Sequence, residues 1–326
     1  MQNHSGKKEP NLRNIIEHID PDWSKFAVIW PVLELYEGPA RGRPEFDLAK
    51  LGTAFSPARI NELPHPIVSP VLVIGGGSGL IPLFLAKQGH DVTSIDSCKE
   101  MVQLSQERAS KEKTKIKIQH CDGKDLDFPE SFFNTVIINT GVITQTTLHS
   151  DSVAEILKRS HKILSPNGRL LVTLCLETPA NHFERHVHKA LGLNQKPSNC
   201  VLFLEDGTLE SVRNKFLEKK NLDAAEVKKI FRNTSDFLQL YHAKFVAIGK
   251  ELRKKGYDPV SFVGRVFRCE MPYLNGTQQK ELLEKVGSYF KIVESKLMSD
   301  HETAYIIGQN KVSPDLGNNR SPARKK

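Results

Sequence analysis

The stretch that most constrains the fold of this chain is a run of four apolar residues followed directly by closely spaced glycines, Val71-Leu72-Val73-Ile74-Gly75-Gly76-Gly77-Ser78-Gly79. Consecutive apolar residues predict a short strand that is buried on both faces, as in parallel sheets. Residues 80–88 then have the pattern of a helix, with Pro82 in its first turn and Gly89 at the C′ position. Because glycine has no Cβ, this strand, turn and helix can bring main-chain groups against a nucleotide.

The spacing of the glycines distinguishes two kinds of nucleotide-binding turn. The dinucleotide fingerprint Gly-x-Gly-x-x-Gly would place its third glycine at position 80, which is Leu80. The spacing found, Gly75-x-Gly77-x-Gly79, instead resembles motif I of the class I S-adenosylmethionine-dependent methyltransferases. Asp96, at the end of the second predicted strand, suits a ribose diol. Both cofactor families use such an acid, so Asp96 does not decide between them.

Strands alternate with helices beyond the glycine turn, which predicts a right-handed parallel sheet. The expected strands are 71–74, 91–95, 115–120, 135–139 and 169–176, and the expected helices are 80–88, 99–110 and 151–164. Alternating polarity places 115–120 near an edge of the sheet, and continuous apolarity places 135–139 in its centre. Ser165-Pro166-Asn167-Gly168 predicts a tight turn before the fifth strand.

The C-terminal part predicts a helix over 277–289 and then two strands, 290–298 and 303–309. The connection 299–302 is too short for a parallel crossover, so these two strands must be antiparallel. A parallel sheet closed by an antiparallel hairpin is the methyltransferase topology, and the resemblance implies the strand order 3-2-1-4-5-7-6. We therefore expect an α/β fold with a Rossmann-like class I methyltransferase sheet.

Four parts are expected along the chain. Residues 1–67 form an N-terminal helical and irregular cap, whose aromatic cluster either packs on the sheet edge or lines a pocket. Residues 68–177 and 271–310 form the S-adenosylmethionine-binding core. Residues 178–270 are too many for a connection and predict a helical insertion after strand five. A long helix within this insertion is expected to end at Gly256. We expect the insertion to serve as a lid that sets substrate specificity. Residues 311–326 are expected to be a disordered basic tail.

Composition narrows the functional classes. No apolar run reaches the length of about 18 residues that a membrane span needs, and the polar first ten residues predict no secretory signal. The 5 cysteines are odd in number and never spaced as Cys-x-x-Cys, which favours reduced thiols in a cytoplasmic compartment and no structural zinc. The net charge of +8 is compatible with an acidic partner, but the basic residues of 178–270 are interleaved with acidic ones, as on a solvated helix face.

The resemblance also implies which residues contact S-adenosylmethionine. They follow the carboxyl ends of the strands, where ligands of parallel α/β sheets bind. The expected cofactor-binding residues are Gly75, Gly76, Gly77, Gly79, Asp96, Ser97, Asp122, Gly123, Asn139 and Thr140. By this resemblance Asp96 binds the ribose hydroxyls, Asp122 accepts from the adenine amino group with the Gly123 backbone beside the ring, and main-chain groups near Asn139 and Thr140 face the methionine ammonium.

One position departs from the family pattern. The residue two before the first glycine is usually acidic, and here it is Val73. Without that carboxylate the glycine loop lacks a group that normally organises its polar atoms. This leaves open a non-catalytic binding protein that retains the fold.

The sequence does not identify a catalytic residue. Methyl transfer from a sulfonium needs mainly alignment and a dry site, and a base only where the acceptor must lose a proton. His182 and His186, just beyond strand five, and Tyr241 on the insertion are candidates for such a base, although an exposed polar helix start is the simpler explanation of the histidines.

The leading interpretation is an S-adenosylmethionine-dependent methyltransferase that acts on a small or medium organic acceptor held under the insertion. An RNA methyltransferase is the alternative that the positive charge supports, and a non-catalytic binding protein is the alternative that Val73 supports. A nucleotide-dependent oxidoreductase is opposed by Leu80 and by the terminal hairpin. The insertion also offers apolar surface for a homo-oligomer.

Overall fold

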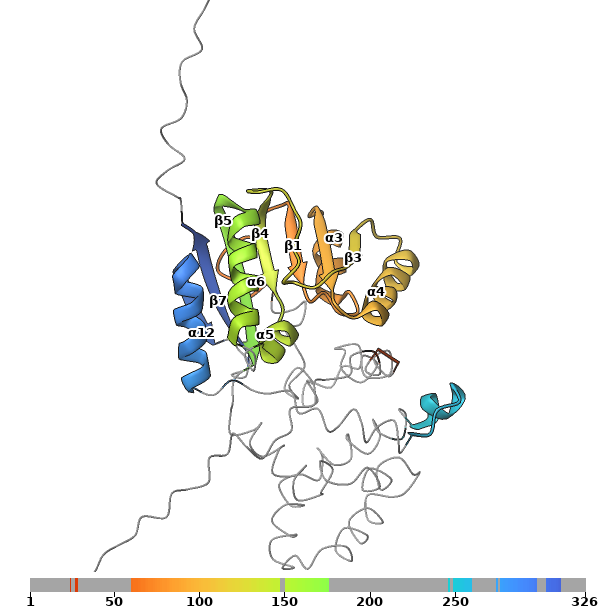
Figure 1. Ribbon diagram of the computed structural model, residues 1–326. Helices are drawn as coiled ribbons and strands as arrows, with labels where there is room; N and C mark the ends of the chain where they lie inside the picture. The colour runs from red at the N-terminus through yellow and green to blue at the C-terminus, as the bar shows by residue number, and fades with distance from the viewer. Residues whose placement is uncertain are drawn as a thin grey trace, which may run out of the picture.

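The computed structural model describes residues 60–146, 150–175, 249–259, 274, 276–297 and 303–311, together with Ser24, Ala27, Val28 and Val246. These residues form a seven-stranded sheet with helices packed against it (Figure 1). The elements are β1 (Val71–Ile74), α3 (Leu80–Lys87), β2 (Val92–Asp96), α4 (Lys99–Lys111), β3 (Lys117–His120), β4 (Phe133–Ile138), α5 (Thr140–Thr146), α6 (Ser150–Ile163), β5 (Leu164–Cys175), α12 (Gly276–Tyr289), β6 (Phe290–Leu297) and β7 (Thr303–Asn310).

The strand order is β3-β2-β1-β4-β5-β7-β6, which confirms the predicted topology. The first five strands are parallel, and β7 runs antiparallel to both β5 and β6. β3 lies at an edge and β4 lies between β1 and β5, as their polarity patterns predict. Because β1 pairs with β2 on one side and with β4 on the other, the order of strands reverses beside β1. This is where a parallel α/β sheet leaves a crevice for a ligand.

The apolar residues of β1 serve two separate cores, one on each face of the sheet. Leu72 and Ile74 pack with the apolar faces of α6 and α12, whereas Val71 and Val73 pack with α3. Figure 1 shows α6 and α12 side by side across one face of the sheet. A strand that is covered on both faces needs apolar residues at every position, because successive side chains point to opposite faces.

Helix α3 ends as its sequence predicts. Gly89 adopts a left-handed conformation with φ +91°, its N–H donates to the carbonyl of Ala86 (3.0 Å), and the N–H of His90 donates to the carbonyl of Leu85 (3.2 Å). These two bonds satisfy carbonyl groups of the last turn, which a helix leaves without partners. Gly256 ends the described helical residues 249–254 in the same conformation, with φ +79°.

The prediction of a tight turn between α6 and the fifth strand was wrong. Pairing of β5 begins at Leu164, opposite Phe133, and resumes at Arg169, opposite Thr135, so residues 165–168 bulge within the strand. The side-chain amide of Asn310 donates to the carbonyls of His161, Leu164 and Ser165, at 3.3, 2.7 and 3.1 Å. The Asn310 amide therefore satisfies the Ser165 carbonyl at the start of the bulge and two carbonyls just before it.

Most of the predicted cap, insertion and tail lie outside the described residues. One contact joins described parts of two of them, because the Lys255 ammonium donates to the carbonyl of Val28 (3.1 Å). Across the part of the chain that the structure describes, no helix is both long enough and apolar enough to cross a membrane.

Candidate functional site

The glycine turn follows the carboxyl end of β1, beside the reversal of strand order. Gly75, Gly77 and Gly79 have positive φ values of 74°, 54° and 91°. A Cβ on Gly75 would collide with Val142, and one on Gly79 would lie 2.5 Å from the Ser105 hydroxyl oxygen. A Cβ on Gly77 would meet nothing described within 4 Å. Close packing therefore excludes side chains at Gly75 and Gly79, whereas Gly77 borders open space.

Asp96 at the end of β2 holds this turn from one side. Its Oδ2 accepts the N–H of Gly77 (2.8 Å) and its Oδ1 accepts the N–H of Cys98 (2.8 Å). Burial raises the pKa of the Asp96 carboxyl above its ordinary value of 3.8, against the lowering effect of the two backbone N–H groups and of the charge on His120. A carboxylate oxygen has two lone pairs, so each of these oxygens can still accept a hydroxyl.

Asn139 at the end of β4 holds the turn from the other side. Its Nδ2 donates to the carbonyl of Gly75 (3.0 Å), and its Oδ1 accepts the N–H of Thr140 (2.9 Å). These partners fix which end of the amide faces each group, because a carbonyl only accepts and an N–H only donates. The hydroxyls of Thr140 and Thr173, both fully buried, lie 3.0 Å apart behind the amide.

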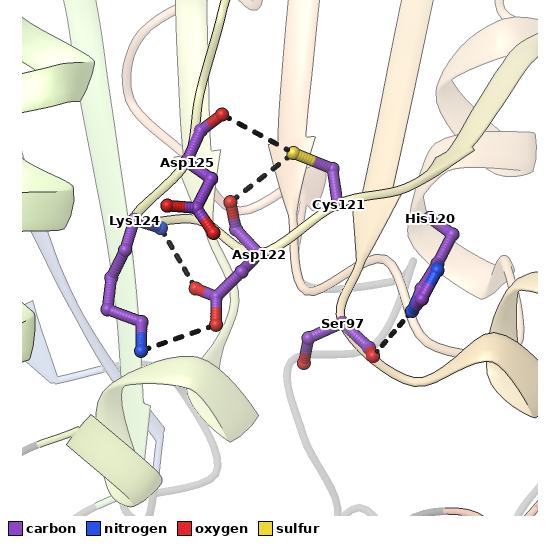
Figure 2. Close-up of polar contacts among 6 residues, drawn as sticks. All are labelled: Ser97, His120, Cys121, Asp122, Lys124 and Asp125. Atoms are coloured by element: carbon purple, nitrogen blue, oxygen red, sulfur yellow. Dashed lines mark hydrogen bonds and ion pairs between the residues drawn. The ribbon is translucent and has the colours of Figure 1, made fainter.

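Residues 122–125 form a turn after β3 (Figure 2). The N–H of Asp125 donates to the carbonyl of Asp122 (2.9 Å), and the Asp122 side chain accepts the N–H of Lys124 at Oδ1 (2.9 Å). The Lys124 ammonium lies 3.4 Å from Oδ2 of the same carboxylate. Gly123 is buried, and a Cβ there would lie 2.9 Å from the Ile74 side chain, so packing against the sheet is sufficient reason for this glycine.

His120 connects the ends of β3 and β2, as Figure 2 shows. Its Nε2 lies 2.9 Å from the carbonyl oxygen of Ser97. Because a carbonyl oxygen can only accept, Nε2 carries the hydrogen of this bond. The bond fixes the loop that contains Ser97 next to the turn that contains Asp122.

A thiol beside Asp96 does not add a nucleophile to this site. Burial raises the pKa of Cys98 to about 11, so the thiol stays protonated at neutral pH. Cys98 and Cys121 are free cysteines. No group of three His, Cys, Asp or Glu side chains that could hold a metal ion occurs among the described residues.

All ten residues expected to bind the cofactor lie in or beside the loops at the carboxyl ends of β1 to β4, so the structure brings them to one edge of the sheet. The candidate bases His182, His186 and Tyr241 lie outside the described residues. The sequence alone did not indicate the contacts of His120, Lys124 and Thr173 or the existence of helix α5. For His120 and Lys124, the one available signal was that each lies two residues from Asp122 in the sequence.

The sequence of residues 72–172 matches the family model described as a methyltransferase domain. This range contains the glycine turn, Asp96 and Asn139, and it ends within β5. This part of the described core is therefore similar to a methyltransferase domain. The strand order of the sheet agrees with this assignment independently of the sequence match.

Relatives of the methyltransferase domain align over only part of this chain. An uncharacterized protein of Mycobacterium tuberculosis is 38% identical over 73 residues, which are 22% of this chain and 27% of the relative. A ubiquinone/menaquinone biosynthesis C-methyltransferase of Nitrosospira multiformis is 29% identical over 102 residues, which are 31% of this chain and 40% of the relative. The chain therefore spans less than half the length of either relative.

Solved structures align over more of the chain at low identity. A protein of Pyrococcus horikoshii has a TM-score of 0.46 at 13% identity, with 86% of this chain and 98% of that one covered. A 1,6-didemethyltoxoflavin N1-methyltransferase of Burkholderia thailandensis has a TM-score of 0.43 at 15% identity, with 90% and 91% covered.

Proposed function

We propose that this chain is an S-adenosylmethionine-dependent methyltransferase that transfers a methyl group to a small or medium organic acceptor. The observation that carries the proposal is the glycine turn at the reversal of strand order, held on one side by Asp96 and on the other by Asn139. The turn combines main-chain groups, open space at Gly77 and a carboxylate with free lone pairs.

The donors and acceptors of this edge suit an adenosyl ligand. Asp96 can accept the two ribose hydroxyls, and Asp122 can accept the amino group of adenine. Gly75, Gly76, Gly77 and Gly79 would lie along the methionine and ribose, with Ser97 and Gly123 beside the adenosine, and main-chain groups of Asn139 and Thr140 would face the ammonium. S-adenosylmethionine would supply a methyl group on a positively charged sulfur, and the chain's own residues would orient the ligand and exclude water.

The buried environment of Val73 favours an active site over a non-catalytic relic. Val73 is fully buried among apolar side chains that include Ile81 and Ile137. The glycine turn does not depend on a carboxylate at that position, because Asp96 and Asn139 already pair with its polar groups. The glycine turn therefore loses fewer hydrogen-bond partners through the absence of an acidic residue at position 73 than the family pattern suggests.

A small-molecule acceptor is supported by two relatives whose names describe C-methyltransferases of ubiquinone and menaquinone biosynthesis. Their aligned segments cover 40% and 41% of those proteins, so they bear on the cofactor domain more than on the acceptor. In our proposal the insertion at 178–270 closes over the acceptor, and its own residues select it.

The test is transfer of label from methyl-labelled S-adenosylmethionine to cell extract divided into a small-molecule fraction and an RNA fraction. We expect the purified chain to label a compound in the small-molecule fraction. A Gly77→Leu variant should fail to do so, because the new side chain would fill the open space beside the turn and would be strained at φ +54°. Label confined to RNA would establish the RNA methyltransferase instead, and label in neither fraction would contradict the proposal.

A further inference from the structure

We propose that Lys124 sets how strongly the site selects the 6-amino group of adenine, by competing with that group for the carboxylate of Asp122. The inference rests on the proposed function, in which Asp122 accepts from the adenine amino group. Lys124 is not among the residues that the methyltransferase resemblance implies.

Lys124 contacts both oxygens of the Asp122 carboxylate. Oδ1 accepts the main-chain N–H of Lys124 at 2.9 Å, and Oδ2 lies 3.4 Å from its ammonium. Figure 2 shows the Lys124 side chain folded back along the turn toward this second oxygen. An adenine amino group that donates to Oδ2 would therefore meet an oxygen already shared with a cation.

The ammonium is not needed to hold Asp122 in position. The turn is closed by the Asp125 N–H at 2.9 Å, and the thiol of Cys121 donates to the carbonyl of Asp122 at 3.3 Å. The main-chain N–H of Lys124 orients the carboxylate whatever side chain residue 124 carries, provided that it is not proline. Loss of the ammonium should therefore leave the acceptor in place and remove only its competitor.

The ion pair is weak enough for a ligand to displace. The Lys124 and Asp122 side chains keep 45% and 38% of their surface exposed, so water and salt screen the attraction between them. While the pair persists, its positive charge also reduces the negative potential that the adenine amino hydrogen meets. Both effects lower the affinity for an amino-bearing base and leave a base without that group unaffected.

The experiment measures dissociation constants of S-adenosylhomocysteine and of its 6-deamino analogue, in which hydrogen replaces the amino group. Lys124→Met, which keeps the length and removes the charge, should bind S-adenosylhomocysteine about two- to fivefold more tightly, as expected for loss of a partly exposed ion pair. It should not bind the deamino analogue more tightly. Unchanged or weaker binding of S-adenosylhomocysteine by this variant would overturn the inference.

Matched variants separate charge at the site from charge in general. Lys124→Arg keeps a cation beside Asp122 and should behave like the unaltered chain. Lys117→Met removes the same charge from an exposed position at the start of β3 and should also leave both dissociation constants unchanged. If Lys117→Met also bound S-adenosylhomocysteine more tightly, the effect would come from the net charge of the protein. That result would also overturn the inference.

Failure of the proposed function would have a different signature. If the unaltered chain does not bind S-adenosylhomocysteine, both the function and the inference fail. If Asp122→Ala leaves the preference for the amino-bearing ligand unchanged, the placement of adenine against Asp122 fails, and the inference fails with it. If Asp122→Ala removes that preference and Lys124→Met has no effect, the inference about Lys124 fails alone.

Discussion

At the scale of single residues, the site depends on a few side chains that form hydrogen bonds with main-chain groups of the loops beyond the strands. Asp96 accepts two backbone N–H groups at 2.8 Å and is buried enough that the pKa of its carboxyl is raised. Folding therefore retains a carboxyl group in a place where burial opposes its charge. Such a group is typical of ligand sites, where function and not stability selects the residue.

The raised pKa of Asp96 predicts opposite effects of acid on binding and on stability. The folded chain holds the Asp96 proton more tightly than the unfolded chain does. The contribution of this group to the free energy of unfolding is therefore lost as the pH rises through the folded pKa, and it is regained on acidification. Protonation also converts an acceptor for ribose hydroxyls into a donor, so affinity for S-adenosylhomocysteine should fall as the pH decreases.

Calorimetric titrations from about pH 7 down to about pH 4, near the ordinary pKa of an aspartate, would measure this dependence, which begins at a higher pH than for an ordinary aspartate. The Asp96→Asn variant carries an amide that does not titrate, and it should bind more weakly at neutral pH and lose the dependence. A pH profile shared by the variant and the unaltered chain would remove Asp96 from ribose binding.

Asn139→Asp should weaken the glycine turn because a carboxylate oxygen would replace the Nδ2 that donates to the Gly75 carbonyl. Two acceptors would then face each other, at a cost of about 1–3 kcal/mol in the free energy of unfolding. Denaturant unfolding measures this loss, and titration with S-adenosylhomocysteine should show weaker binding by the folded variant. Unfolding and binding unchanged from the parent chain would show that Asn139 does not support the turn.

Val73→Asp, which restores the family's usual acidic residue, should destabilise this chain. Val73 is fully buried in an apolar cluster, so the new carboxyl would lack polar partners there. We expect a loss of about 3 kcal/mol or more in the free energy of unfolding, as for a buried unpaired charge. Val73→Leu is the apolar control for altered packing. A stable Asp variant with tighter S-adenosylhomocysteine binding would show that the glycine turn does lack a carboxylate.

At the scale of elements, the sequence predicted the strands and helices of the core because their apolar patterns match the faces that they bury. β1 is apolar at every position since α3 covers one face and α6 and α12 cover the other. The bulge in β5 was mistaken for a tight turn, because Pro166-Asn167-Gly168 is typical turn sequence and the partner that satisfies the bulge, Asn310, lies far away in the chain.

Asn310→Ala tests this explanation of the bulge. The variant would leave carbonyls of the α6–β5 junction without the donor that now lies 2.7 Å from Leu164 and 3.1 Å from Ser165. We expect a loss of about 1–3 kcal/mol in stability, measured by thermal or denaturant unfolding. Gln309→Ala on the same strand is the control and should cost less. Equal losses for the two variants would mean that the Asn310 amide does not stabilise the bulge.

At the scale of the whole molecule, the order of strands determines where the site can be. Both the reversal beside β1 and the antiparallel terminal hairpin followed from pattern and connection length, and the sheet confirms them. The glycine turn and the acid after β2 were predicted from local spacing. The contacts between strand ends were not, because His120–Ser97 and Asn139–Gly75 join residues that are distant in sequence and depend on side-chain placement.

We expect the glycine turn to bind an adenosyl ligand of the methyltransferase kind and not a dinucleotide. The most direct measurement is calorimetric titration of the purified chain with S-adenosylhomocysteine and, separately, with NADH. We predict saturable binding of S-adenosylhomocysteine with a dissociation constant on the order of micromolar, corresponding to about 8 kcal/mol, and no binding of NADH. Binding of NADH alone would contradict our interpretation of the glycine spacing, and binding of neither would contradict the proposed function.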